Sequence, residues 1–326
     1  MSTIFVSEIF GPHALPQASQ EFARDVLAGL RLQPKRLSSK YFYDARGSEL
    51  FEAICEQPEY YLTRTELAIM HERVHEIADT LGPRVRLVEY GSGAGSKTRL
   101  LLSALIDPVA YVPVEISRSA LDDSVGRLAG QFPSVEMLPL CADFTRTTTA
   151  PRPARAERRT VVYFPGSTLG NFDAQESLSL LRQMRRIAGA DGAVLIGLDL
   201  KKDAAEIEAA YNDRAGLTRE FTLNLLARIN RELHGDFDIA RFEHRARYNA
   251  LAGRIETYIV SLAAQRVSVC GRQFSFDPAE SMLVEYSTKY SREDIQQLAR
   301  RVELQVDRIW TDADERFAVV LLTVPA

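Results

Sequence analysis

The sequence has few cysteines, no long apolar run and no excess of basic residues, and each of these absences excludes a class of protein. Its three cysteines, Cys55, Cys141 and Cys270, are too widely spaced for a disulfide framework or a C-x-x-C metal pair. No stretch approaches the ~18 uninterrupted apolar residues of a membrane span. The first 20 residues lack the basic start and apolar run of a secretion signal. We therefore expect a cytoplasmic protein with no membrane partner.

The balance of charge argues against a nucleic-acid partner. Forty Lys and Arg residues stand against 44 Asp and Glu residues, which gives a net charge of −4. A protein whose main partner is nucleic acid usually attracts it with a basic surface. We expect a small-molecule ligand, no nucleic-acid partner and a monomeric protein.

From Arg84 to about residue 200, short apolar segments alternate with helical ones. The apolar segments are VRLVEY, AYVPVEI, VEMLPL, VVYFPG and AVLIGLDL, and the intervening helices begin near Ser96, Ser117 and Asp173. Continuous apolar strands separated by helices are typical of a parallel sheet covered on both faces. Near the end, LQVDRIW and RFAVVLLTV flank the short turn TDADE. We predict an α/β fold with a doubly wound sheet and a terminal antiparallel hairpin.

The length of 326 residues exceeds that of most single domains, and the pattern changes outside the α/β region. The first 61 residues are rich in loops. After residue 200, two helical segments precede alternating ones such as RIETYIVSLAAQRVSV and SMLVEYSTKY. We predict a discontinuous α+β substrate-binding lobe (residues 1–61 and 200–286) and an α/β domain (residues 62–199 and 287–326).

A glycine-rich turn, GSGAG, follows the first strand and precedes a helix that carries Lys97. Its glycines, which include Gly91 and Gly93, allow a sharp bend and let a ligand approach the backbone amides. The dinucleotide fingerprint G-x-G-x-x-G needs glycine where Ser96 stands, which disfavours a nicotinamide cofactor.

Acidic residues follow the next two strands. Glu115 ends the strand AYVPVEI, where a carboxylate can accept both hydroxyls of a ribose. Asp143 and Phe144 follow the third strand, where they can bind an adenine by a hydrogen bond and by stacking. Nucleoside chemistry at three consecutive strand ends favours S-adenosylmethionine over a nicotinamide.

A possible zinc motif lies on a helix that we predict from Thr63 to Leu81, with Thr63 or Thr65 as its N-cap. His71, Glu72 and His75 match H-E-x-x-H, in which two imidazoles bind zinc and the glutamate acts as a base. The continuation EIADTL offers no third histidine. A zinc-dependent hydrolase is therefore a remote alternative, and we expect no metal.

These motifs together resemble those of the L-histidine Nα-methyltransferases of ergothioneine biosynthesis. The resemblance runs from about Lys40 to Tyr290 and rests on KYFYDARGSELFEAICEQPEYYLTRTE, EYGSGAGSKTRLLL, YVPVEIS, FPGSTLGNF, AAYNDRAGLTREFTLNLLARINRELHGDFD and EYSTKYS. It implies a methyltransferase that uses S-adenosylmethionine and no metal to convert histidine into the trimethylated betaine hercynine. It also implies a class I methyltransferase domain and a substrate lobe.

The resemblance further implies which residues form the site. Those at cofactor positions are Gly91, Gly93, Lys97, Glu115, Asp143 and Phe144, with Glu115 where the family commonly has Asp. Asn171 and Tyr211 match residues that bind the substrate carboxylate, and Tyr43 and Tyr60 match aromatic residues that line the pocket. Tyr43 lies beside the amine, as either a base or a hydrogen-bond partner.

Glu285 and Ser287 match the pair that recognises the imidazole, and their spacing supports this role. Residues two apart on a strand share one face. A carboxylate that accepts one ring N–H, with a hydroxyl that donates to or accepts from the other nitrogen, can read an imidazole.

One position departs from the family. Thr257 stands in RIETY where the family commonly has Met against the substrate side chain. A short hydroxyl residue would enlarge and polarise this wall of the pocket. Another amino acid is therefore the leading alternative substrate.

Overall fold

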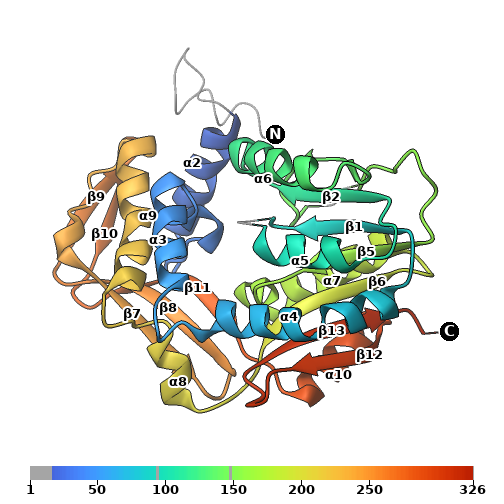
Figure 1. Cartoon of the computed structure of the whole chain (residues 1–326). Helices are drawn as coiled ribbons and strands as arrows, with labels where there is room; N and C mark the ends of the chain where they lie inside the picture. Colours follow the sequence, from blue (N-terminus) through green and yellow to red (C-terminus); the bar gives the residue numbers. More distant parts are fainter. Residues whose placement is uncertain (1–16, 93–94, 147–148, 326) are drawn as a thin grey trace. The chain divides into compact units, whose positions relative to one another are not determined.

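The structure is a computed structural model that describes residues 17–92, 95–146 and 149–325. The chain divides into two compact units (Figure 1). Unit 1 comprises Met1–Tyr61 and Asp203–Tyr286, and unit 2 comprises Leu62–Lys202 and Ser287–Ala326. That unit 1 binds the substrate and unit 2 the cofactor remains a prediction.

Unit 2 contains an eight-stranded sheet in the order β12-β13-β6-β5-β1-β2-β3, with β4 also paired to β2. The strands are β1 (Val85–Tyr90), β2 (Ala110–Glu115), β3 (Glu136–Met137), β4 (Leu140–Cys141), β5 (Arg159–Phe164), β6 (Ala193–Asp199), β12 (Gln305–Thr311) and β13 (Phe317–Thr323). Strands β1 to β6 pair in parallel, whereas β13 is antiparallel to both β6 and β12. The predicted doubly wound sheet with a terminal antiparallel hairpin is confirmed.

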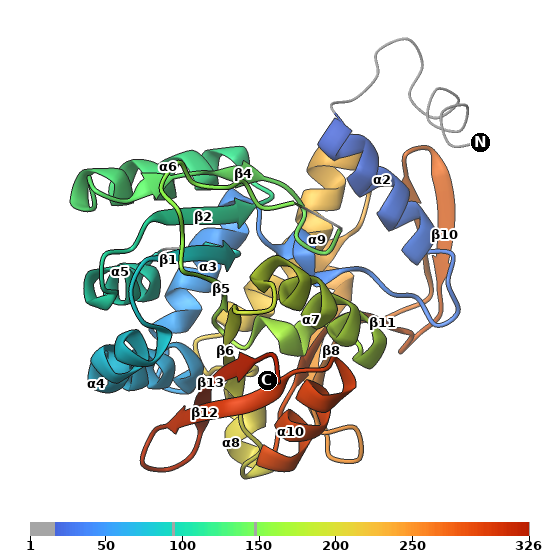
Figure 2. The ribbon, with the colours of Figure 1, turned by 90° about the vertical axis from the view of Figure 1, so that its right-hand side faces the viewer.

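Helices cover both faces of this sheet. They are α4 (Tyr61–Leu81), α5 (Ser96–Ala104), α6 (Arg118–Gln131), α7 (Ala174–Ala188) and α10 (Arg292–Arg301). Figure 2 shows α4 and α5 on one face and α7 and α10 on the other. The helix α7 begins where predicted, because the Asp173 side chain accepts from the backbone N–H of Glu176 in a reciprocal capping box. The predicted N-cap of α4 at Thr63 or Thr65 is wrong, since this helix begins at Tyr61.

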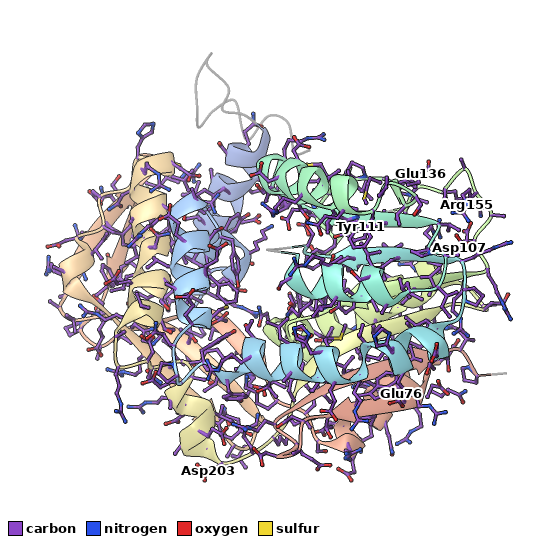
Figure 3. The ribbon with its side chains drawn as sticks, viewed as in Figure 1. Glu76, Asp107, Tyr111, Glu136, Arg155 and Asp203 are labelled. Atoms are coloured by element: carbon purple, nitrogen blue, oxygen red, sulfur yellow. The ribbon has the colours of Figure 1, made fainter. Side chains whose placement is uncertain are left out.

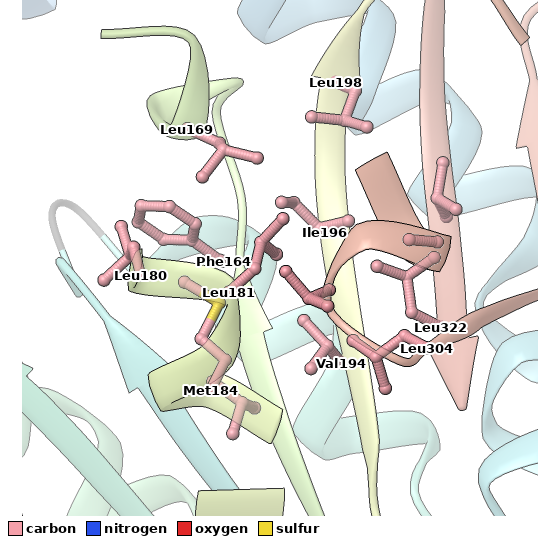
Figure 4. Packing of buried hydrophobic residues seen from close by; sticks show 14 of the residues in the cluster. Phe164, Leu169, Leu180, Leu181, Met184, Val194, Ile196, Leu198, Leu304 and Leu322 are labelled. Atoms are coloured by element: carbon pink, nitrogen blue, oxygen red, sulfur yellow. The ribbon is translucent and has the colours of Figure 1, made fainter. Parts of the chain in front are cut away.

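A hydrophobic core fills the face under α7 and α10 (Figure 4). Alternate residues of β6, namely Val194, Ile196 and Leu198, pack there with side chains of both helices. The other residues of β6 are buried too, and the whole strand is covered. Burial on both faces explains why these strands read as continuous apolar runs.

The segment VEMLPL differs from the prediction of one strand. It forms two short strands, β3 and β4, with Pro139 between them. Proline has no N–H to donate to a sheet, so pairing with β2 is interrupted there.

Polar contacts lie at the amino end of the sheet, opposite the glycine turn. Arg155 Nη2 lies 2.7 Å from Asp107 Oδ1, and Glu136 accepts from the backbone N–H of Ala154 at 2.7 Å (Figure 3). The carboxyl ends of the strands, where ligands bind in sheets of this kind, lie at the other end.

Unit 1 is an α+β structure. Its helices are α2 (Gln17–Gly29), α3 (Ala45–Cys55), α8 (Ala204–Ala209) and α9 (Leu217–Leu233), with short 3₁₀ turns η1 (Ser39–Phe42) and η3 (Ile239–Arg241). A three-stranded sheet has the order β11-β8-β7, from β7 (Phe242–Asn249), β8 (Arg254–Ser261) and β11 (Ser281–Thr288), and β9 (Gln265–Val269) pairs with β10 (Arg272–Phe276). The boundary between the units falls within β11, after Tyr286.

Among the helices of the described residues, none has the length and apolar character needed to span a membrane.

Candidate functional site

The glycine turn lies at the carboxyl end of β1. Gly91 has φ of 72° and Gly95 has φ of 73°, a left-handed region in which a side chain is strained. A Cβ atom on Gly91 would lie 3.8 Å from Cε1 of Phe144, so the turn passes close to that ring. Gly93 lies outside the described residues.

The ring of Phe144 is held in place by its neighbours. It stacks on Tyr90 with a centroid distance of 5.2 Å and an interplanar angle of 16°. Gln183 Nε2 donates to the Tyr90 hydroxyl at 2.8 Å and to the Phe144 carbonyl at 2.9 Å. Gln183, which was not predicted from the sequence, thus ties α7 to the end of β1.

Two carboxylates lie near this turn. Glu115 is the last residue of β2 and pairs in register with Cys141, the last residue of β4. Asp143 comes two residues after Cys141, so the two acids lie at the same end of adjacent parallel strands. Glu115 accepts from the backbone N–H of Ile116 at 2.8 Å, but burial dominates and raises the pKa of its carboxyl. Asp143 accepts from the Thr145 backbone N–H at 2.9 Å. Unit 2 thus brings Gly91, Glu115, Asp143 and Phe144 to one end of its sheet.

Lys97 is paired with a buried carboxylate that the sequence analysis missed. Its Nζ lies 2.5 Å from Glu66 Oε2, and the Glu66 side chain is only 1% exposed. Glu66 also accepts from the backbone N–H of Gly166 at 3.0 Å. A Cβ atom on Gly197 would lie 2.2 Å from Glu66 Oε1, so glycine leaves the space that the carboxylate fills. The signal that could have indicated a buried Glu66 is its spacing from Leu62 of α4. Residues four apart share one face of a helix, and Leu62 is buried.

A second buried acid, Glu89, lies two residues before the glycine turn. Its carboxylate accepts from Thr98 Oγ1 at 2.8 Å and from the Tyr111 hydroxyl at 2.5 Å. Burial raises the pKa of Glu89 to about 7, although both hydrogen bonds oppose the shift. An acid in the mostly apolar strand β1, VRLVEY, directly before the glycine turn was the signal that could have identified it.

The turn that carries Asn171 packs against the backbone beside Ser287. This turn, η2 (Thr168–Asn171), follows β5. A Cβ atom on Gly170 would lie 2.8 Å from the carbonyl oxygen of Thr288, so only glycine allows so close an approach. The structure therefore brings Asn171 and Ser287 to the same part of unit 2.

Ser287 also contacts a buried ion pair that the sequence analysis missed. Lys289 Nζ donates to Ser287 Oγ at 2.8 Å and lies 2.7 Å from Asp199 Oδ2. Lys202 Nζ lies 2.6 Å from the other oxygen of Asp199. The side chains of Asp199 and Lys289 have no exposed surface.

In unit 1, three predicted tyrosines belong to one aromatic cluster. Tyr43 packs edge-on against Phe51 at 5.5 Å, Phe51 against Tyr60 at 6.0 Å, and Tyr60 against Tyr211 at 6.3 Å between centroids. Phe221 of α9 packs against Tyr43 at 5.5 Å. Tyr60 and Tyr211 are buried, whereas 43% of Tyr43 is exposed. Phe51 and Phe221, which were not predicted from the sequence, contact these tyrosines.

Although 43% of the Tyr43 residue is exposed, neighbouring atoms crowd its hydroxyl and raise the pKa of that group. Desolvation raises its pKa far above the usual range, and the nearby Glu285 raises it further. A tyrosine with so high a pKa retains its proton at neutral pH. Tyr43 can therefore donate or accept a hydrogen bond but is a poor base.

Thr257 and Glu285 lie on β8 and β11, neighbouring strands of the unit 1 sheet. Thr257 Oγ1 donates to Glu285 Oε2 at 3.5 Å, a long hydrogen bond, and Thr257 is only 1% exposed. The hydroxyl that distinguishes this chain from the family pattern is thus directed at the acid that we predict to bind the ring.

The possible zinc motif lies on the exposed face of α4. His71, Glu72 and His75 are exposed, and Arg73 Nη2 lies 2.9 Å from Glu72 Oε1. Across residues 17–92, 95–146 and 149–325, no group of three His, Cys, Asp or Glu side chains is arranged to hold a metal ion.

Comparison with known proteins gives matches across both units. The family described as "Histidine-specific methyltransferase, SAM-dependent" matches residues 22–324. The histidine N-alpha-methyltransferase of Mycolicibacterium smegmatis is 36% identical, over 94% of this chain and 96% of that protein. The histidine N-alpha-methyltransferase of Mycobacterium tuberculosis is 38% identical, over 91% and 93%. Neither a different amino-acid substrate nor zinc-dependent hydrolysis is favoured by these matches.

Proposed function

Because this chain belongs to the family of histidine-specific, S-adenosylmethionine-dependent methyltransferases, we propose that it methylates the α-amino group of L-histidine. Three successive transfers would give hercynine, a step of ergothioneine biosynthesis. The observation that carries this proposal is the 36% identity over 94% of the chain with a histidine N-alpha-methyltransferase. We also propose that the enzyme is a cytoplasmic monomer that needs no metal.

The cofactor residues that we propose lie in unit 2. Glu115 would bind the ribose hydroxyls, and Asp143 and Phe144 the adenine, while Gly91 and Gly93 give the cofactor access to the backbone. Lys97 uses one of its three N–H groups on Glu66 and can offer others to the cofactor carboxylate. The bound cofactor supplies a methyl group already activated by its sulfonium.

The substrate residues that we propose in unit 2 are Asn171 and Ser287. We assign the substrate carboxylate to Asn171 and Tyr211 and the imidazole to Glu285 and Ser287. The aromatic rings would line the pocket, with Thr257 at its wall. The proposed residues of unit 1 are Tyr43, Tyr60, Tyr211, Thr257 and Glu285.

Each transfer requires an amine without its proton. The nitrogen lone pair forms the new N–C bond as the S–C bond breaks, and the amine proton is released before each attack. An α-amino group has a pKa near 8 in peptides, so deprotonation costs about 1.4 kcal/mol for each pH unit below that value. Because its raised pKa makes Tyr43 a poor base, we assign it to positioning the amine by a hydrogen bond. Aromatic rings also favour the growing cationic charge.

Glu285→Ala tests the proposal. The protein is mixed with S-adenosylmethionine and each amino acid in turn, and products are read by mass. We expect wild type to add up to three methyl groups to histidine, and Glu285→Ala to raise the KM for histidine by about 50-fold, because a hydrogen bond to a charged group is lost. The dissociation constant for S-adenosylmethionine should not change.

Glu243→Ala is the matched control, since Glu243 lies in the same sheet and its side chain is 39% exposed. Methylation of another amino acid in place of histidine would overturn the proposed substrate. An unchanged preference for histidine in Glu285→Ala would overturn the role of Glu285 alone.

A further inference from the structure

A buried carboxylate in unit 2, that of Glu66, pairs with the ammonium of Lys97. Glu66 lies on α4 and Lys97 on α5, and their charged groups are 2.5 Å apart. Only 1% of the Glu66 side chain and 17% of the Lys97 side chain are exposed. Burying two charges is costly, and an apolar pair of similar volume often stabilises a protein equally well. Stability alone is therefore a poor explanation for this pair.

The place of Lys97 on its helix supports the same conclusion. Lys97 is the second residue of α5, and the N-terminal end of a helix carries a partial positive charge from the helix dipole. A lysine in this turn adds positive charge where the helix disfavours it. Its charge is therefore better explained by an anion that it binds than by the stability of α5.

The carboxylate of Glu66 is fixed by groups other than Lys97. It accepts from the backbone N–H of Gly166, at 3.0 Å to Oε2 and 3.1 Å to Oε1. It also fills the space beside Gly197 of β6, where a Cβ atom would lie 2.2 Å from Oε1. Because Gly166 follows β5, these contacts anchor the carboxylate to two strands of the central sheet.

The anchored carboxylate places the ammonium at the carboxyl end of the sheet. Gly166 comes two residues after the end of β5, and a Cβ atom on it would lie 3.7 Å from Lys97 Nζ. Ligands bind at this end of sheets of this kind. A lysine side chain is a flexible stem of four carbons, and Glu66 restricts its charged end to one point there.

We propose that Glu66 is a positioning residue that holds the Lys97 ammonium where it binds the carboxylate of S-adenosylmethionine. The inference rests on the proposed function, in which Lys97 binds that carboxylate. An ammonium has three N–H donors, so it can bond to Glu66 and to the cofactor at once. Because Glu66 holds the ammonium in advance, binding of the cofactor does not have to order a flexible side chain.

Calorimetry with two ligands tests the inference. One is S-adenosylhomocysteine, the product left after methyl transfer, and the other is its decarboxylated analogue, which lacks only the carboxylate. We expect wild type to bind S-adenosylhomocysteine about 50-fold more tightly than the analogue, because an ion-paired hydrogen bond is lost with the carboxylate.

Glu66→Gln keeps the shape of the side chain and an oxygen for the Gly166 N–H, but it removes the charge that holds Lys97. It should raise the Kd of S-adenosylhomocysteine about tenfold and leave the Kd of the decarboxylated analogue unchanged. A general loss of structure would instead weaken the binding of both ligands.

Two further variants separate the position of the ammonium from its charge. Glu66→Asp keeps the negative charge but shortens the side chain by one carbon, so it should also weaken the binding of S-adenosylhomocysteine alone. Lys97→Met should bind the two ligands almost equally, and adding Glu66→Gln to it should change neither Kd. The double variant contains no unpaired charge from this pair, so it guards against misfolding.

Glu72→Gln is the matched control, because Glu72 lies on the same helix and its side chain is 65% exposed. This variant should bind both ligands as wild type does.

Equal weakening of both ligands by Glu66→Gln would overturn the inference, as would unchanged binding of both. Tighter binding of S-adenosylhomocysteine would also overturn it, since Glu66 would then compete with the cofactor for Lys97. In each of these cases wild type would still bind S-adenosylhomocysteine, and the proposed function would stand. A wild-type protein that binds neither ligand would overturn the proposed function and this inference together.

Discussion

Two candidate residues of unit 2 and the candidate tyrosines of unit 1 differ in the kind of contact that surrounds them. In unit 2, Lys97 forms an ion pair with the buried Glu66. Ser287 accepts a hydrogen bond from Lys289, which forms a buried ion pair with Asp199. In unit 1, the predicted tyrosines contact other aromatic rings, as Tyr60 contacts Tyr211 at 6.3 Å between centroids. A charged contact fixes the position of a single side-chain atom, whereas contacts between rings fix the shape of the surface that the rings form.

This difference suits the ligands that we propose. Lys97 binds, in our proposal, a cofactor that is the same in every turnover, so its ammonium can be fixed by a contact that tolerates little change. A pocket made of aromatic rings gains its energy from contact area and tolerates small shifts. We therefore expect substitutions in unit 2 to be costly to stability, and those in unit 1 to act mainly on substrate preference.

The largest effect should come from Lys97→Met. It leaves Glu66, which is 1% exposed, without its ammonium partner, and removing one partner of a buried pair costs about 3 kcal/mol. Urea unfolding should show this loss of stability, and calorimetry should show weaker binding of S-adenosylmethionine. Glu66→Gln combined with Lys97→Met should restore most of the stability but not the binding.

Arg99→Met is the control for this variant, since Arg99 lies on the same helix, α5, and is exposed. If Lys97→Met were as stable as wild type, unit 2 would not depend on its buried charges, and the contrast between the units would fail.

The next prediction concerns how the free energy of unfolding depends on pH, which has opposite signs for Glu89 in unit 2 and His244 in unit 1. The pKa of Glu89 in unit 2 is raised from 4.5 to about 7. Between these two pH values the folded state keeps a proton that the unfolded state has released. Stability from Glu89 is therefore full below pH 4.5 and is lost as pH rises to about 7, with a slope of at most about 1.4 kcal/mol per pH unit. Urea unfolding of wild type and Glu89→Gln across this range should differ by that slope.

His244 in unit 1 supplies the opposite case. Burial lowers the pKa of this imidazole below 6.5, and its ring nitrogens contact Thr222 Oγ1 and the Tyr211 carbonyl, each at 3.0 Å. Its contribution to stability is lost as pH falls below 6.5, because the unfolded state then binds the proton more readily.

A Glu89→Gln protein with the same pH dependence as wild type would show that Glu89 is ionised in the folded state.

Much of unit 2 could be predicted because its signals are local. Apolar strands alternating with helices predict the sheet, and topology places the ends of parallel strands together, which brings Gly91 near Glu115 and Asp143. The split of VEMLPL into β3 and β4 was missed, although Pro139 marks the point of interruption.

The partners of the site residues could not be predicted, because they are distant in sequence. Glu66 and Lys97 are 31 residues apart, and Gln183 and Tyr90 are 93 apart. No local pattern specifies such pairs, since their geometry appears only when helices pack on the sheet. In unit 1, Phe51 and Phe221 read as ordinary core positions of helices, and only folding brings them to the tyrosines.

Thr257→Val should have the smallest effect and tests how unit 1 sets substrate preference. Valine keeps the branched shape but removes the hydroxyl that donates to Glu285 at 3.5 Å. A bond this long contributes little, so we expect the KM for histidine to rise only about threefold, with unchanged binding of S-adenosylmethionine. Thr257→Ser, which retains the hydroxyl, should behave like wild type. If valine and serine were equivalent, the hydroxyl would have no part in orienting Glu285. Substrate preference in unit 1 would then depend on the shape of the pocket alone, which would make the contrast with the charged contacts of unit 2 complete.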